Sequence, residues 1–188
     1  MVLASVIITL NGQEMLNKIT PRTWYLFVVI CCAALVGFAL YNQHVNFLDP
    51  CPLCIIQRVA FVAIGSIALL AAIHGPKQIG RHIYAWLLVV SATFGAFIAG
   101  RHVWLQNLPP DQVPECGPGL NYMLENFPLT EVLSTVLKGD GNCAEVLWTF
   151  MGMSMPMWTF TWYLGLGLLT LWLVYLRPKT DTGKSVYQ

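Results

Sequence analysis

Four long apolar runs dominate this sequence and restrict what it can fold into. They cover residues 23–41, 55–74, 83–100 and 157–176, and Arg58 is the one charged residue within them. Each run approaches the roughly 20 residues that a helix needs to cross a hydrocarbon core of about 30 Å. The runs are continuous rather than alternating, which argues against transmembrane strands. The sequence therefore predicts an all-α integral membrane protein, a bundle of four transmembrane helices.

The amino-acid composition agrees with a membrane protein. Charged residues make up 10% of the 188-residue chain, whereas a soluble domain has about 25%. The net charge of +1 gives no electrostatic reason to expect nucleic acid as a partner. Aromatic residues, which mark membrane interfaces, lie near the ends of the runs: Trp24, Tyr25, Tyr84, Trp86, Trp158, Trp162, Trp172 and Tyr175.

The basic residues predict how the chain is oriented. Seven of the ten lie in short segments on one side of the membrane: Lys18, Arg22, Lys77, Arg81, Arg177, Lys179 and Lys184. By the positive-inside rule this side is cytoplasmic. We therefore expect an inner tail 1–22, a short outer loop 42–54, an inner loop 75–82, a long outer loop 101–156 and an inner tail 177–188. The apolar start of the chain, residues 1–10, is too short to span and lacks the features of a signal peptide.

The outer side is where most of the cysteines gather. Cys51 and Cys54 end the short outer loop, whereas Cys116 and Cys143 lie in the long one. Outside the cytoplasm such thiols are expected to pair. Pairing within each loop is the natural arrangement, although four cysteines allow three connectivities and the sequence does not choose among them. A bridge between Cys116 and Cys143 could also be a structural staple worth about 3–4 kcal/mol.

The C-P-L-C stretch of residues 51–54 is harder to explain as a staple. Cys54 begins the second apolar run, where the helix dipole and unpaired N–H groups favour an anion and hence a thiolate. Arg58 follows one helical turn later, where its guanidinium could stabilise that thiolate or hold the oxygen of a reducible ring. The alternative for Arg58 is an interfacial arginine that reaches lipid phosphates.

Other candidate residues carry weaker signals. His44 and His102 both lie at the outer interface, where a histidine is more often a hydrogen-bonded surface residue than a catalyst. His102 could instead donate to an acceptor ring if the third run packs beside the second. Cys31 and Cys32 lie in the middle of the first run and, as small apolar residues, receive no role.

Taken together, these residues resemble the disulfide bond formation protein B (DsbB) family of bacterial inner-membrane, quinone-linked thiol oxidases. The resemblance covers about residues 20–178 and leaves out residues 1–19. It rests on the four spans and on three stretches: Asp49-Pro50-Cys51-Pro52-Leu53-Cys54 with Arg58, Pro110 to Gly119 around Cys116, and Gly141 to Glu145 around Cys143, followed by Trp148 and Met155-Pro156.

The resemblance implies a role for each matching residue. Cys116 and Cys143 would oxidise a DsbA-like periplasmic dithiol protein, with Cys116 forming the mixed disulfide. Cys143 would then exchange with Cys51, leaving Cys54 as the thiolate that faces ubiquinone or menaquinone. Arg58 matches the quinone-site arginine and His102 the quinone-contacting histidine. Residue 57 is Gln where some members carry an acid, so no proton role is transferred to it.

The resemblance also implies the setting. Both termini would be cytoplasmic and both outer loops periplasmic, and the segment Phe150–Met155 would form a short helix on the outer membrane surface.

Two further readings remain open at this point. One is a quinone-coupled thiol enzyme with a different dedicated partner, or a relative of vitamin K epoxide reductase. The other is a structural or sensing tetraspan protein whose outer cysteines bind a metal such as Zn²⁺, although the spacing of Cys116 and Cys143 is unusual for ligands. A b-type cytochrome is weaker still, because His44 and His102 face outward while His74 and His82 lie inward.

Overall fold

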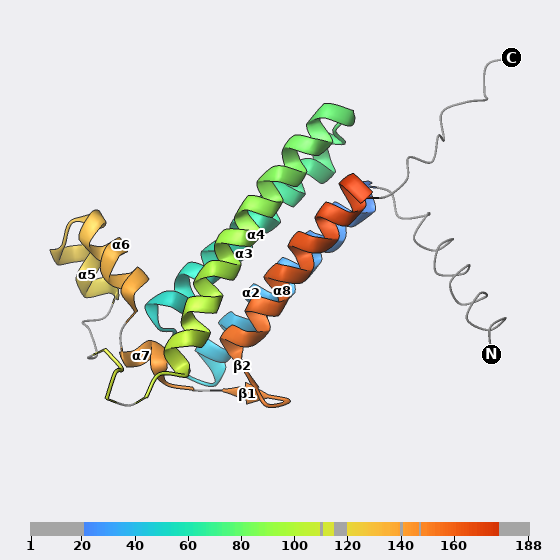
Figure 1. Ribbon diagram of the computed structural model, residues 1–188. Helices are drawn as coiled ribbons and strands as arrows, with labels where there is room; N and C mark the ends of the chain where they lie inside the picture. Colours follow the sequence, from blue (N-terminus) through green and yellow to red (C-terminus); the bar gives the residue numbers. More distant parts are fainter. Residues whose placement is uncertain (1–20, 110, 115–119, 140, 147, 177–188) are drawn as a thin grey trace, which may run out of the picture.

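The computed structural model describes residues 21–109, 111–114, 120–139, 141–146 and 148–176. Within this part the chain forms four long helices, which run side by side in Figure 1. They are α2 (Pro21–Val45), α3 (Pro52–His74), α4 (Gln78–Gln106) and α8 (Met155–Leu171), and a π-helical turn, η1 (Trp172–Leu176), continues α8. All four are long and apolar enough to cross a membrane, which confirms the predicted helical, multi-pass fold.

The helices extend beyond the apolar runs that predicted them. The third helix continues past Gly100 as far as Gln106, so Arg101 and His102 lie on its last turns and not in a loop. A helix does not stop where the apolar run stops, because its hydrogen bonds continue as long as the backbone can make them. The extra turns bring His102 level with the start of α3.

The bundle is held together around small residues. Helix α4 packs against both α3 and α8, and α2 packs against α3. Alanines fill much of the buried centre: Ala60, Ala68, Ala71, Ala72, Ala92, Ala96 and Ala99. Small side chains let helix backbones approach closely, which is the usual packing mode in membranes. Large apolar side chains such as Ile30, Ile73 and Phe97 point outward and are more than 60% exposed.

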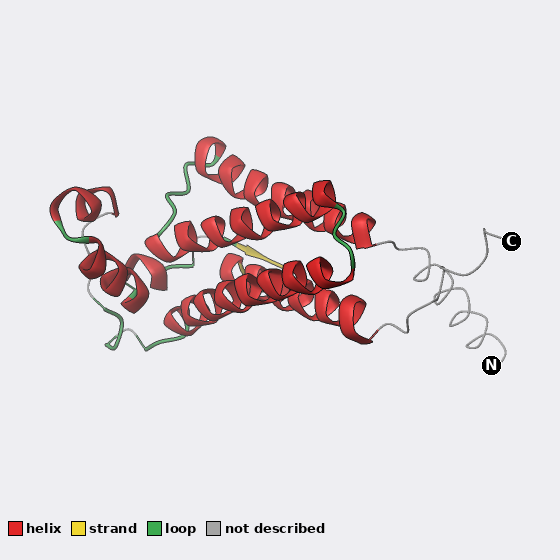
Figure 2. Ribbon diagram, turned by 90° about the horizontal axis from the view of Figure 1, so that it is seen from above, coloured by secondary structure: helices red, strands yellow, loops and turns green. Residues whose placement is uncertain are grey.

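One end of the bundle carries the long loop. Helices α5 (Leu120–Asn126) and α6 (Leu129–Lys138) lie to the side of the bundle, and α7 (Gly141–Ala144) lies at its end (Figures 1 and 2). Helix α7 packs against α3 and α4, and α6 against α3. The long loop thus folds back onto the start of α3.

The expected short helix over Phe150–Met155 is wrong. Strand β1 (Thr149–Phe150) pairs antiparallel with β2 (Met153–Ser154) to form a small hairpin. The turn residues Met151 and Gly152 both have positive φ, 52° and 78°, which is the backbone that a tight hairpin turn requires. Helix α8 then starts at Met155, with Pro156 in its first turn.

Candidate functional site

The C-P-L-C stretch forms the start of α3. Cys51 is the N-cap, with extended backbone (φ −65°, ψ 162°), and its carbonyl accepts the first helical bond from Ile55 N at 3.2 Å. Pro52 occupies the first turn, where the missing N–H does no harm. Cys54 therefore sits on the first turn, and its Sγ lies 3.1 Å from the Sγ of Cys51. A shift of about 1 Å would bring the two sulfurs to disulfide distance.

His102 reaches the cysteine pair from α4. Its ring is buried, with Nε2 lying 3.7 Å from Cys51 Sγ and Nδ1 lying 4.0 Å from Cys54 Sγ. The sequence suggested this neighbourhood on the condition that the second and third spans pack together, and they do. A group that can donate or accept a proton thus touches both sulfurs.

A buried polar network fixes the position of His102. Gln57 Nε2 lies 3.1 Å from His102 Nδ1, and the Thr159 hydroxyl donates to Gln57 Oε1 at 2.6 Å. The Tyr163 hydroxyl donates to the backbone carbonyl of Gln57, also at 2.6 Å. Because buried polar groups are costly when unpaired, this chain of bonds connects α3, α4 and α8 at the level of the cysteines.

Cys143 joins the same region from α7. Its side chain is fully buried and belongs to an apolar cluster with Cys51, Leu53, Ile98 and Leu105. Three of the four cysteines outside the apolar runs are thus brought to one end of the bundle. The fourth, Cys116, lies outside the described residues, so the predicted pairing with Cys143 stays a prediction.

Arg58 is anchored to the first long helix. Its Nη1 donates to Gln43 Oε1, and its Nη2 donates to the Ala39 carbonyl at 3.2 Å. These two acceptors, both on α2, keep the guanidinium inside the protein rather than extended toward lipid phosphates. The anchored guanidinium lines both of the pockets that border Cys54.

The larger pocket, of about 230 Å³, lies among α2, α3, α8 and the hairpin. Its walls are mostly apolar and aromatic, and Arg58 is the one charged residue among the described residues that line it. The lining is Leu35, Val36, Phe38, Ala39, Cys54, Gln57, Arg58, Phe61, Trp148, Phe150, Met155, Pro156, Trp158, Thr159 and Trp162. Apolar walls with a few convergent polar groups are typical of sites for small organic ligands.

A smaller pocket, of about 50 Å³, lies at the end of the bundle. Polar residues line it together with Cys51, Cys54 and His102, namely Asn42, Asp49, Arg58, Gln106, Asn142 and Glu145. Among the cysteines that the structure describes, Cys54 alone lines both pockets, whereas Cys51 lines the smaller one and belongs to the cluster that contains Cys143. The two sulfurs thus face different surroundings.

Sequence reasoning missed two residues of this site and gave little weight to some others. Gln57 bonds His102, and Thr159 bonds Gln57. The signal for Gln57 was an uncharged polar residue three positions after Cys54 in an apolar run. His44 Nδ1 lies 2.9 Å from the Leu40 carbonyl on the exposed surface of α2, which matches the surface reading. Cys31 and Cys32 lie mid-helix, away from the site.

The fold and the site together define a multi-pass membrane protein with a thiol pair at one end of its bundle, beside a histidine and an apolar pocket. Comparison with protein families matches residues 21–173 to the family described as "Disulfide bond formation protein DsbB". The chain belongs to the DsbB family, which implies thiol oxidoreductase activity.

Individual relatives agree with the family match. A protein named "Disulfide bond formation protein B" from Nitrosococcus oceani is 53% identical, over 79% of this chain and 89% of the relative. Proteins of the same name from Chromobacterium violaceum and Hahella chejuensis are 49% and 50% identical, each over 86% of this chain and 98% of the relative. The chain therefore spans nearly the whole length of these relatives.

Proposed function

We propose that this protein oxidises a DsbA-like periplasmic dithiol protein and passes the electrons to ubiquinone or menaquinone in the membrane. The observation that carries the proposal is the position of Cys54, which lines the large apolar pocket together with Arg58. A quinone ring needs apolar and aromatic walls, a donor for its carbonyl oxygen and a nearby electron source. The pocket offers all three.

The likeness to the DsbB family supplies the order of the electron route, and the buried cluster shared by Cys51 and Cys143 supports one of its steps. A thiolate of the partner protein attacks Cys116 of a Cys116–Cys143 disulfide, and the Cys143 thiolate then attacks Cys51 of the Cys51–Cys54 disulfide. Cys54 leaves as a thiolate beside the pocket. The partner's second thiolate attacks the mixed disulfide, which forms the partner's own disulfide and expels the Cys116 thiolate. The Cys116 thiolate then attacks Cys143 in the Cys143–Cys51 bond, which restores the Cys116–Cys143 disulfide and expels the Cys51 thiolate. The result is one new disulfide in the partner and a reduced Cys51–Cys54 pair.

Return of this pair to the disulfide delivers two electrons and two protons to the quinone. Arg58 donates hydrogen bonds to a carbonyl oxygen, which favours the more negative, reduced ring. His102 lies within reach of a ring that contacts Cys54, because its Nδ1 is 4.0 Å from that sulfur. Its contact with Cys51 Sγ, at 3.7 Å, also suits it to take a proton from this thiol.

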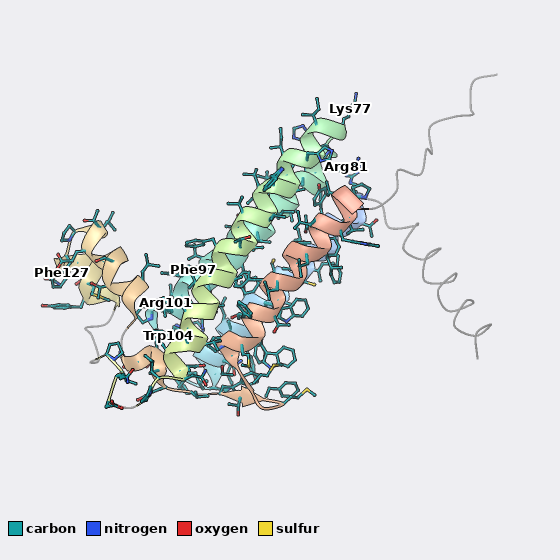
Figure 3. All side chains as sticks on the ribbon, in the orientation of Figure 1. Lys77, Arg81, Phe97, Arg101, Trp104 and Phe127 are labelled. Carbon is teal, nitrogen blue, oxygen red and sulfur yellow. The ribbon has the colours of Figure 1, made fainter. Side chains whose placement is uncertain are left out.

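We infer that the protein lies in the bacterial inner membrane with the cysteine end toward the periplasm. Figure 3 supports this orientation, because Lys77 and Arg81 lie at the end of the bundle opposite to Arg101 and Trp104. A basic cluster at one end marks the cytoplasmic side. Both termini and the loop 75–82 are then cytoplasmic, and the loops 42–54 and 101–156 periplasmic.

Replacing Cys54 tests the proposal directly. The Cys54→Ser variant should insert normally but lose quinone reduction, because a hydroxyl cannot cycle between thiolate and disulfide. The assay follows quinone absorbance with purified protein and a reduced DsbA-like substrate. Cys32→Ala is the matched control, a buried cysteine away from the site, and should retain full turnover. Undiminished turnover in Cys54→Ser would refute the assignment.

The order of events in the long loop has its own test. Cys116→Ser should prevent capture of the partner in a mixed disulfide, since the first nucleophilic attack is at this sulfur. Non-reducing gel electrophoresis followed by mass spectrometry identifies the trapped species. Continued trapping through Cys143 would reverse the order. A panel of dithiol proteins in the same assay tells a general oxidase from one with a dedicated partner.

A further inference from the structure

The sulfur atoms of Cys51 and Cys54 and a ring nitrogen of His102 lie together in a geometry typical of metal ligands. All three ligand atoms lie within 4.8 Å of one another. We propose that the reduced Cys51–Cys54 pair and His102 form a binding site for a thiophilic divalent cation, with Zn²⁺ as the ion that fits the donor set. The site would exist in the reduced protein and disappear when the two cysteines form a disulfide.

The observed distances are close to those that zinc requires. Zn–S bonds of about 2.3 Å and Zn–N bonds of about 2.0–2.1 Å in a tetrahedron place two sulfurs about 3.8 Å apart and a sulfur and nitrogen about 3.5 Å apart. In the structure Cys51 Sγ is 3.7 Å from His102 Nε2 and 3.1 Å from Cys54 Sγ. Cys54 Sγ lies 4.0 Å from the other ring nitrogen, Nδ1, so coordination through Nε2 also needs the two thiol side chains to rotate.

The surroundings supply the support that a metal-bound histidine needs. If Nε2 binds the ion, Nδ1 carries the proton and requires an acceptor. The Gln57 amide lies 3.1 Å from Nδ1, and turning it over would place its oxygen there and its NH₂ group toward the Thr159 hydroxyl. The orientation of an amide is assigned from its hydrogen bonds, so the same network serves either arrangement.

Three protein ligands leave one position of the tetrahedron, as in zinc sites that keep a water. The small pocket beside these residues, of about 50 Å³, has room for that water. Cys143 belongs to the same buried cluster as Cys51 and is the alternative fourth ligand. The number of thiolates that bind the ion distinguishes the two arrangements.

Binding involves no electron transfer. Two thiols lose their protons to solvent and become thiolates, and the histidine binds as the neutral ring. A disulfide sulfur has no thiolate to offer, so the ion competes with formation of the Cys51–Cys54 bond. Bound Zn²⁺ would therefore hold the pair reduced and stop electron delivery to quinone. This consequence for activity rests on the proposed function.

Cobalt provides a spectroscopic test that does not depend on turnover. We expect Co²⁺ added to the full-length, phosphine-reduced protein in detergent to give thiolate charge-transfer absorption and the visible bands of tetrahedral Co²⁺. Zn²⁺ should displace the Co²⁺ and bleach both signals. Protein oxidised beforehand with quinone should give neither signal. Tetrahedral bands of equal strength in the oxidised protein would overturn the proposal.

Variants assign the ligands. Cys54→Ser and His102→Ala should each abolish the tetrahedral spectrum, whereas Gln57→Leu should weaken Co²⁺ binding by about 10–100-fold, as loss of an outer hydrogen-bond partner does. The double variant Cys31→Ala/Cys32→Ala is the control and should bind Co²⁺ as the parent does. Full binding in His102→Ala would overturn the site. Cys143→Ser should lower the charge-transfer intensity if Cys143 is a ligand and leave it unchanged if water is.

Inhibition is a separate measurement. Zn²⁺ should slow quinone reduction by the parent protein, and a chelator should restore it. Binding without inhibition would overturn the regulatory consequence alone. Turnover without Co²⁺ or Zn²⁺ binding would overturn the metal site and leave the proposed thiol oxidase standing, so the two proposals fail independently.

Discussion

At the scale of single residues, Cys51 and Cys54 differ in their surroundings. Cys51 caps α3 and packs in the cluster that contains Cys143, whereas Cys54 borders the large apolar pocket. They are three residues apart in the chain, so about one helical turn separates the cysteine beside Cys143 from the cysteine beside the pocket. His102 lies near both sulfurs, 3.7 Å from Cys51 Sγ and 4.0 Å from Cys54 Sγ.

Arg58 is the residue through which we expect the quinone to be held. Arg58→Ala should raise the Michaelis constant for quinone by about tenfold or more, because a hydrogen bond to a charged group contributes about 1.5–3 kcal/mol. The Michaelis constant for the partner protein should change little. Steady-state kinetics with each substrate varied in turn measure both constants.

Arg58→Lys refines this prediction. Lysine keeps the positive charge but lacks the planar guanidinium, which can bond Gln43, the Ala39 carbonyl and a ligand at the same time. The Michaelis constant for quinone should therefore lie between those of the parent and Arg58→Ala. Equal rises in both Michaelis constants for Arg58→Ala would argue against a quinone contact.

At the scale of elements, the α6–α7 connection decides where Cys143 lies. Gly139 ends α6 with φ 77° and ψ 158°, a conformation that is nearly restricted to glycine. A Cβ at this position would lie 2.3 Å from Leu105 Cδ1 and 3.5 Å from Leu53 Cδ1. The absence of a side chain thus lets α7 pack closely against α3 and α4.

Gly139→Ala should therefore impair the loop more than the bundle. The backbone strain of about 1–3 kcal/mol and the contact with Leu105 should displace α7 and with it Cys143. We expect slower oxidation of the partner protein, while quinone reduction by a small dithiol that attacks Cys51–Cys54 directly is retained. Parallel assays with the two reductants measure this difference.

Gly152→Ala is the matched control for Gly139→Ala. Gly152 also has positive φ, 78°, but a Cβ there meets nothing within 4 Å. It should therefore show the backbone strain without the displaced α7. Equal losses of partner oxidation in the two variants would show that the position of α7 does not matter.

At the scale of the whole molecule, the site depends on how closely α3, α4 and α8 approach. Tyr163 of α8 stacks on Phe61 of α3, with ring centroids 4.1 Å apart, and its hydroxyl bonds the Gln57 carbonyl. Gly95 of α4 leaves room for this ring, since a Cβ there would lie 2.4 Å from Tyr163 Cε1. One tyrosine thus connects three helices just beneath the cysteines.

Gly95→Ala should loosen this junction. Overpacking of a tight core costs about 1–3 kcal/mol, so the melting temperature in detergent should fall by several degrees. Gly165→Ala, on α8 with nothing within 4 Å of its added Cβ, is the control and should melt as the parent does. An unchanged melting temperature in Gly95→Ala would contradict the close packing of α4 on α8.

Local sequence determined much of this protein. Continuous apolar runs of near-spanning length predicted the four helices, because a buried backbone in lipid must satisfy its own hydrogen bonds. The second apolar run, expected from Ile55, placed the start of α3 to within three residues, since the helix begins at Pro52 and proline suits a first helical turn. These features concern neighbours in the chain, so spacing and residue type suffice. The matching motifs also identified the family.

Tertiary structure alone decided what surrounds the sulfurs. Gln57 and Thr159 are separated by about a hundred residues, and no local pattern predicts that they bond each other. Nor does it predict that Gln57 also bonds His102. The end of α4 at Gln106 and the hairpin in place of the expected helix over Phe150–Met155 were likewise settled by packing and turn geometry. The physical reason is that helix packing, which sequence periodicity does not specify, chooses which distant side chains share one buried site.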